Sequence, residues 1–278
     1  FYLREWINTF IENEMGGGTW QWETKETLVD ETTVTTNRLG EALASFVPEE
    51  GGAYHVVAEP ASPDRATEAI RTSLFIWVAG PDYVSWRREN HDRITLISDK
   101  DTYQVGETAE ILIPSPFEPP HYALVTVERE GIRRHDVIRL DSNSTIYRLP
   151  IVAGDIPNIY VSVVLIQPRG DDVAALKMGI LPLTVDPAPR ALDVTVEADR
   201  ERAEPGEAVT YTITVRTPDG RPATNAELSL DLVDKAVLSL KPRTQDILSR
   251  LYAHRSLQVG TSSGLSISVN RYQHELAE

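Results

Sequence analysis

The residues best suited to hydrolytic chemistry are a serine set between two glycines near the end of the chain. Residues 260–264 read Gly-Thr-Ser-Ser-Gly and match the Gly-x-Ser-x-Gly pattern that exposes a serine nucleophile. Such a serine needs a histidine base oriented by a carboxylate. His274 follows Ser262, but no aspartate does, and the surroundings do not alternate strands and helices. We therefore interpret these residues as a loop, and we expect no catalytic residue and no enzyme.

The residues that could bind a metal are scattered. There is no cysteine, so no thiolate ligand, disulfide or cysteine nucleophile is possible. The acidic pairs at residues 99–101 and 171–172 lack the alternating oxygen ligands and central glycine of a calcium loop. None of the histidines has the i, i+4 spacing of a zinc helix; they are His55, His91, His121, His135, His254 and His274. We expect no metal and no cofactor.

Charge and hydropathy exclude two further partners. The formal net charge is −15, whereas nucleic-acid binding depends on Lys and Arg that neutralise phosphates. No apolar run approaches the roughly 18 residues of a spanning helix. We expect neither nucleic acid as a partner nor a membrane-spanning segment in this chain.

Two surface features admit a functional interpretation and a structural one. Trp77 and Trp86 flank the Gly80-Pro81 turn and could stack on a sugar, although tryptophans in such strands more often fill a core. Residues 143–145 read Asn-Ser-Thr, an acceptor pattern for glycosylation in a eukaryotic secretory route. We interpret them as core aromatics and as a turn.

The elements that would position any site are strands, and a repeat organises them. Residues 99–109 (Asp-Lys-Asp-Thr-Tyr-Gln-Val-Gly-Glu-Thr-Ala) align with residues 199–209 (Asp-Arg-Glu-Arg-Ala-Glu-Pro-Gly-Glu-Ala-Val). Each copy has an alternating strand before a Gly-Glu turn and a second one after it. The strand before the turn is marked in the first copy by Ile94 and Leu96, and in the second by Leu192, Val194 and Val196.

Short alternating strands separated by turn residues predict an all-β chain of tandem antiparallel β-sandwiches. The length fits two or three such units. We place them at residues 1–92, 93–187 and 188–278, with a stiff linker marked by Pro182, Pro187 and Pro189.

Three further segments have separate predictions, and the first of them fits two kinds of element. The apolar residues between Leu3 and Ile11 fit helical spacing, but their aromatic content and the following Gly16-Gly17-Gly18 favour a strand that enters a hairpin. Residues 228–240 alternate and predict a strand. Ile247, Leu248, Leu251 and Tyr252 have helical spacing and predict a short amphipathic helix.

Several stretches together resemble the bacterial alpha-2-macroglobulins. Residues 75–80 (Phe-Ile-Trp-Val-Ala-Gly), Trp86 and the 99–109 segment resemble a junction between two macroglobulin-like domains. Residues 113–117, 123–131 and 157–163 are similar to the body of the next domain. Residues 232–240 (Leu-Val-Asp-Lys-Ala-Val-Leu-Ser-Leu) resemble the strand before the protease-sensitive bait region.

This resemblance implies a function for the larger protein. Its family members are endopeptidase inhibitors whose bait is cut by the attacking protease, after which a collapse traps that protease, with a Cys-x-Glu-Gln thioester as covalent trap. Because this chain has no cysteine, any thioester lies elsewhere or is absent. The implied partners are attacking endopeptidases and other domains of the same protein. The implied location is extracellular, periplasmic or at the cell surface, where the protein would protect a bacterial cell.

The same resemblance makes the end of the third unit the start of the bait region. Candidate cleavage residues there are both basic and apolar: Arg243, Arg250, Leu251, Tyr252, Arg255, Arg271 and Tyr272. The bait could instead begin only after Val269. A rival interpretation is a tandem immunoglobulin-like stalk or adhesin of a bacterial surface, and a third is the accessory sandwich of a polysaccharide enzyme. A stalk, however, does not explain the break in strand pattern after Leu240.

Overall fold

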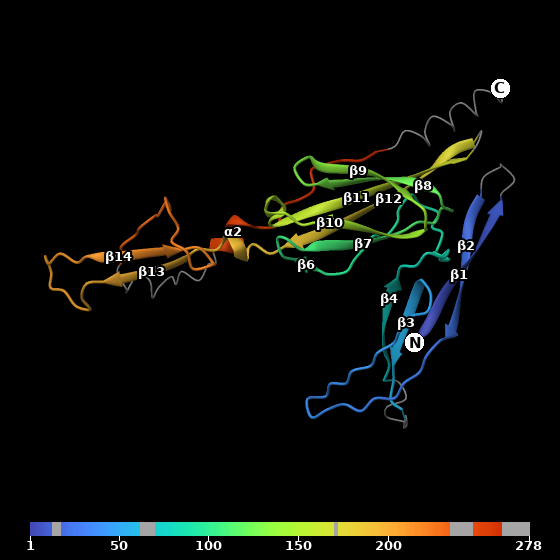
Figure 1. The fold of residues 1–278 in the computed structure, drawn as a ribbon, viewed down its shortest axis with the longest axis horizontal. Helices are drawn as coiled ribbons and strands as arrows, with labels where there is room; N and C mark the ends of the chain where they lie inside the picture. The colour runs from blue at the N-terminus through green and yellow to red at the C-terminus, as the bar shows by residue number, and fades with distance from the viewer. Residues whose placement is uncertain (13–17, 62–69, 170–171, 234–246, 263–278) are drawn as a thin grey trace.

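The structure, a computed structural model, describes residues 1–12, 18–61, 70–169, 172–233 and 247–262. These residues form an all-β protein, as the sequence predicts (Figure 1). The strand pairs are antiparallel except for one short parallel pair between Thr102–Tyr103 and the end of Asp172–Val185. The described helices are one short α-helix and two 3-10 turns, at Ala153–Asp155 and Ala188–Arg190.

The first part of the chain forms a four-stranded antiparallel sheet. Its strands are β1 (Tyr2–Glu12), β2 (Gly18–Leu28), β3 (Gly52–Ala58) and β4 (Thr72–Val78), in the order β2-β1-β3-β4. β1 and β2 pair along their whole length, from Tyr2 opposite Leu28 to Glu12 opposite Gly18. The expected strand at the start of the chain is therefore confirmed, and its backbone groups pair with those of β2. Of the glycines that predict the hairpin turn, Gly16 and Gly17 lie outside the described residues.

The middle of the chain is a β-sandwich of two sheets. One sheet contains β5 (Ile97–Ser98), β7 (Thr108–Pro114) and β10 (Ser144–Pro150). The other has the order β6-β12-β11-β8-β9, with strands at Thr102–Tyr103, Asp172–Val185, Asn158–Arg169, His121–Glu128 and Ile132–Leu140.

The core of this middle sandwich follows the alternation of the sequence. Side chains two residues apart, such as Ile111 and Ile113 or Val161 and Val163, are fully buried between the sheets. The cluster runs from Leu96 to Val185, and removal of this apolar surface from water is the main stabilisation available to such a sandwich. One expectation was misplaced: the strand predicted around Ile94 and Leu96 appears as β5, which starts only at Ile97.

Beyond the middle sandwich, the chain forms a two-stranded sheet of β13 (Asp193–Ala198) and β14 (Tyr211–Arg216). The strand predicted over residues 228–240 is wrong for residues 228–233, which have no regular secondary structure; residues 234–240 lie outside the described part. Leu230 and Leu232 are 72% and 88% exposed, so the alternation here buries no face, and among the described residues no strand pairs with it. The predicted helix is confirmed as α2 (Ile247–Leu251).

The two copies of the repeat form the same turn. Gly106 and Gly206 both have positive φ, +95° and +89°, where glycine has no steric penalty. The carboxylate of Glu107 accepts a hydrogen bond from the backbone N–H of Gln104, and Glu207 accepts one from Glu204, at 2.8 and 3.0 Å. The two segments that align in sequence thus have the same turn conformation and the same hydrogen bond.

Candidate functional site

After α2 the chain returns to the middle sandwich. Residues 252–258, here called the strap, lie beside the turns that join β8 to β9 and β10 to β11 (Figure 1). The strap contains two of the candidate cleavage residues, Tyr252 and Arg255. The structure therefore shows the surroundings of these two candidate residues.

Arg255 is the best-fixed residue of the strap. The side-chain amide of Asn158 donates to the Arg255 carbonyl oxygen at 2.9 Å, and the Arg255 N–H donates to Asn158 Oδ1 at 2.8 Å. The Tyr160 hydroxyl donates to the same carbonyl oxygen at 3.1 Å, and the Arg255 guanidinium bonds Glu130 Oε1 at 2.9 Å. Both backbone groups and the side chain of one residue are therefore held by three residues of the sandwich.

Buried Arg129 holds the loop of the sandwich to which the strap binds. Its guanidinium, 5% exposed, donates to the carbonyl oxygens of Ile156 and Asn158 at 2.9 and 3.1 Å. These bonds fix the loop that leads into β11, and so they position Asn158. The Arg129 carbonyl oxygen in turn accepts the N–H of Gln258 at 2.8 Å, which ties down the far end of the strap.

Glu130 is held in its ionised form. The hydrogen bond from Arg129 is the main cause that lowers the pKa of the Glu130 carboxyl to about 2, and the bond from Arg255 adds to it. Glu130 is therefore an anion opposite Arg255 at neutral pH. The strap is held by charge as well as by backbone hydrogen bonds.

Aromatic contacts complete the strap. Tyr252 packs against the core of the middle sandwich, and the His254 ring meets the Tyr160 ring edge-on with centroids 6.1 Å apart. By contrast Leu251, the last residue of α2, is 69% exposed. Leu251 at the end of α2 is thus exposed, whereas Tyr252, the next residue, packs on the sandwich.

The other candidate residues divide in the same way. Arg250 lies in α2 next to Leu251. Arg243, Arg271 and Tyr272 lie outside the described residues, as does His274. Ser262 is the last residue described before the end of the chain. Within the described ranges, no group of three or more His, Asp or Glu side chains is placed to hold a metal, and no helix is long and apolar enough to cross a membrane.

An asparagine similar to Asn158 ties the preceding segment to the other end of the sandwich. Asn143 donates to the Val84 carbonyl oxygen at 2.7 Å and accepts the Val84 N–H at 2.9 Å. Its own carbonyl oxygen accepts the indole N–H of Trp86 at 2.7 Å. Asn143 is fully buried, and its amide nitrogen is used within the protein. The interpretation of residues 143–145 as a turn is correct for Asn143 but wrong for Ser144 and Thr145, which begin β10.

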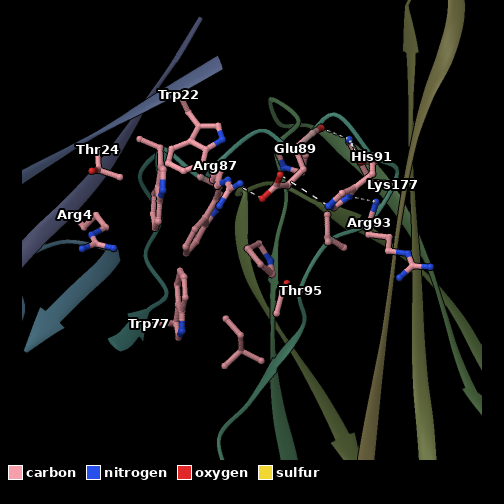
Figure 2. A pocket seen from close by; sticks show the side chains of 16 residues that line it. Arg4, Trp22, Thr24, Trp77, Arg87, Glu89, His91, Arg93, Thr95 and Lys177 are labelled. Carbon is pink, nitrogen blue, oxygen red and sulfur yellow. Dashed lines mark hydrogen bonds and ion pairs between the residues drawn. The ribbon is translucent and has the colours of Figure 1, made fainter. Parts of the chain in front are cut away.

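Trp86 and Trp77 also line a cavity of about 390 Å³ between the first sheet and the middle sandwich (Figure 2). Trp86 is 5% exposed, and its ring packs against Trp77 with centroids 5.5 Å apart. On the first sheet, Trp6 stacks on Trp77 at 6.2 Å. These aromatic rings pack mainly against one another, in line with their interpretation as core aromatics.

The polar groups around the cavity are largely used by the protein itself. Arg87 forms an ion pair with Glu89 at 2.7 Å and covers the face of Trp22 (Figure 2). Lys177 donates to the carbonyl oxygens of Glu89 and His91 at 2.9 and 2.5 Å. We interpret the cavity as the seam where two packed units meet.

The sequence predicts candidate cleavage residues, but it does not indicate Glu130, Asn158 and Tyr160, which bind one of them. No motif marks these three residues. The one local signal is the pair Glu130-Gly131, which is typical of a turn but does not indicate the bond to Arg255.

The described residues form several antiparallel sheets, and the strap is hydrogen-bonded to the middle sandwich. These features define the class as a β-sandwich protein whose connecting segments are bound to a sandwich. Comparison with known families is more specific. The alpha-2-macroglobulin bait region domain matches residues 94–240, and the chain belongs to the alpha-2-macroglobulin family. The matched range covers the middle sandwich and the β13-β14 sheet.

The curated relatives are bacterial proteins of this family. The chain is 33% identical to the alpha-2-macroglobulin of Ralstonia nicotianae over 201 residues, which cover 68% of this chain and 12% of that protein. It is 26% identical over 238 residues to an alpha-2-macroglobulin homolog of Nostoc sp., covering 82% of this chain and 12% of the relative. This chain thus spans about an eighth of the length of these relatives.

Among solved structures, the native conformation of Escherichia coli alpha-2-macroglobulin aligns with 79% of this chain and 14% of its own, at 20% identity and a TM-score of 0.30. A Salmonella alpha-2-macroglobulin mutant aligns with 86% of this chain and 15% of its own, at 21% identity and a TM-score of 0.29.

Proposed function

We propose that this chain is part of a broad-spectrum endopeptidase inhibitor that traps an attacking protease after its bait region is cut, outside or within the envelope of a bacterial cell. The single observation that carries this proposal is the match of the bait region domain to residues 94–240, which ends just before the candidate cleavage residues. The rest of the protein supplies whatever captures the protease, since a thioester needs a cysteine and this chain has none.

The physical requirement of such a bait supports the same placement. A protease cleft accepts an extended strand, so a bond inside a paired strand must first unfold locally before it can be cut. The strands up to β14 are held in ladders, and those of the middle sandwich surround a buried core. The candidate residues from Arg243 to Tyr272 all follow the last described strand.

Limited proteolysis of the whole chain tests this proposal. With trypsin we expect early cuts at Arg271, and secondarily at Arg243, Arg250 or Arg255, because all of these residues follow the last described strand. Arg129, Arg139 and Arg216 should persist. Mass spectrometry of the fragments at short times identifies the order of the cuts.

The opposite order would contradict the proposal. First cuts within residues 93–187 would mean that the chain does not present its late segment to proteases. Such a result would favour the uniform stalk of tandem sandwiches.

A further inference from the structure

The strap holds the atoms that a serine-type protease must itself bind in order to cut after Arg255. Such an enzyme holds the scissile carbonyl oxygen in its oxyanion hole and the preceding side chain in its specificity pocket. In this structure the Arg255 carbonyl oxygen already accepts bonds from Asn158 and Tyr160. The Arg255 guanidinium bonds Glu130 Oε1 at 2.9 Å, although the Arg255 side chain is 52% exposed.

We propose that Glu130, Asn158 and Tyr160 are positioning residues that withhold the Arg255–Ser256 bond from proteases and so determine which bonds of the late segment are cut. This proposal deepens the proposed function and rests on it, because it assigns the cleavage specificity of the same segment. The sequence alone gives Arg255 the same standing as Arg250. The structure adds that Arg255 lies in the docked strap, whereas Arg250 lies in α2.

Asn158 makes the largest contribution to this restraint. It binds both backbone groups of Arg255, as a neighbouring strand would, and it is itself 1% exposed. Buried Arg129 supports it through the carbonyl oxygen of Asn158. To enter a cleft, the strap must break both bonds to Asn158, the bond to Tyr160, the ion pair to Glu130 and the bond from Gln258 to the Arg129 carbonyl oxygen.

Two further contacts hold the strap on either side of Arg255. The Gln258 bond lies three residues beyond Arg255, and Tyr252 packs on the core three residues before it. A protease cleft needs several extended residues on both sides of the cut bond, so these two contacts flank the span that must be released. Cleavage after Arg255 thus requires release of the whole strap and not of one side chain.

The test is the rate of tryptic cleavage after Arg255 in the whole chain, followed by mass spectrometry. In Asn158→Ala we expect this rate to rise on the order of tenfold, because two hydrogen bonds that resist opening are lost. Tyr160→Phe removes one donor and should raise the rate about threefold. Asn158→Asp keeps the acceptor for the Arg255 N–H, loses the donor to the carbonyl oxygen, and should fall between the two.

Tyr122→Phe is the matched control, because Tyr122 is a 59% exposed tyrosine of the same sheet, opposite Ile166 and away from the strap. Its rate after Arg255 should equal that of the unchanged chain. Thermal melting shows whether each variant is folded. If Asn158→Ala does not fold, the comparison of Tyr160→Phe with Tyr122→Phe still decides the question.

Two outcomes would overturn the proposal. One is an unchanged rate after Arg255 in folded Asn158→Ala, or in Tyr160→Phe if the first variant does not fold. The other is Arg255 as the fastest cut of the unchanged chain. Failure of the proposed function has a separate sign, which is early cutting within residues 93–187 whatever the rate after Arg255.

Discussion

At the scale of single residues, two asparagines fix the segments that enter and leave the middle sandwich. Asn143 binds both backbone groups of Val84, and Asn158 binds both backbone groups of Arg255. Each begins or precedes a strand, β10 or β11, so the sandwich holds its side chain in place. A primary amide can donate and accept at once, which lets one side chain replace a strand neighbour.

The charge on Glu130 gives a prediction that belongs to this scale. Its pKa in the folded chain, about 2, lies below that of an unfolded glutamate, near 4.3, because Arg129 bonds its carboxylate. A lowered pKa stabilises the fold fully above the unfolded value, and this stabilisation is lost as the pH falls through the folded value. The window in which it fades is therefore about pH 4.5 to 2.

We expect Glu130→Gln to lower the free energy of unfolding by about 0.5 kcal/mol at pH 7, a small value because the side chain is 43% exposed and solvent screens its pairs. The difference from the unchanged chain should stay constant down to about pH 4.5 and vanish towards pH 2. Urea unfolding of both chains at a series of pH values measures it. A difference that grew on acidification would contradict the pairing of Glu130 with Arg129 and Arg255.

At the scale of elements, the repeated turn is the clearest case of local sequence that specifies local structure. Gly106 and Gly206 take the same positive φ, and Glu107 and Glu207 each bind the backbone N–H three residues earlier. In the first copy Lys100 also bonds Glu107 at 2.8 Å, which lowers the pKa of that carboxyl. In the second copy Arg200 lies 3.8 Å from Glu207.

Replacement of the first of these glycines tests the turn. Gly106→Ala should lower the free energy of unfolding by about 1 to 2 kcal/mol, because a side chain disfavours positive φ. An added Cβ would contact nothing within 4 Å, so the cost comes from the backbone and not from crowding. Thermal or urea unfolding measures the change.

Gly131→Ala is the matched control, since a Cβ there also has open space and its backbone does not have positive φ. It should change the stability by less than about 0.5 kcal/mol. Equal losses in the two variants would mean that the turn conformation is not what Gly106 provides.

At the scale of the whole molecule, the middle sandwich is the body to which the other parts attach. Its core cluster draws on both sheets, whereas β13 and β14 have exposed side chains along most of their length. The first sheet meets it through Trp77, Trp86 and Leu112. Both the entering and the returning segments are bound by residues of this sandwich.

We predict that residues 93–187 fold on their own as an antiparallel sandwich. The core cluster lies almost wholly within this range, so the apolar burial that stabilises it does not depend on the rest of the chain. Circular dichroism should show a β spectrum and one cooperative melt. A helical spectrum, or no cooperative transition, would refute the boundaries at residues 93 and 187.

The sequence by itself determined the elements that depend on neighbours along the chain. Alternation gave the strands of the middle sandwich, the Gly-Glu pairs gave the two turns, and the spacing of Ile247 and Leu251 gave α2. These features are set by backbone sterics and by periods of two or 3.6 residues, which are legible in a single segment. The resemblance carried by residues 75–240 likewise needed no coordinates.

Tertiary structure alone decided where the segments without strong periodicity go. Leu230 and Leu232 alternate like a strand, yet residues 228–233 are irregular, and no strand of the described part of the chain pairs with them. Arg255 is fixed by Asn158 and Glu130, which are 97 and 125 residues away in the chain. Such contacts depend on which surfaces meet after folding, and a polar side chain bound at long range leaves no local pattern in the sequence.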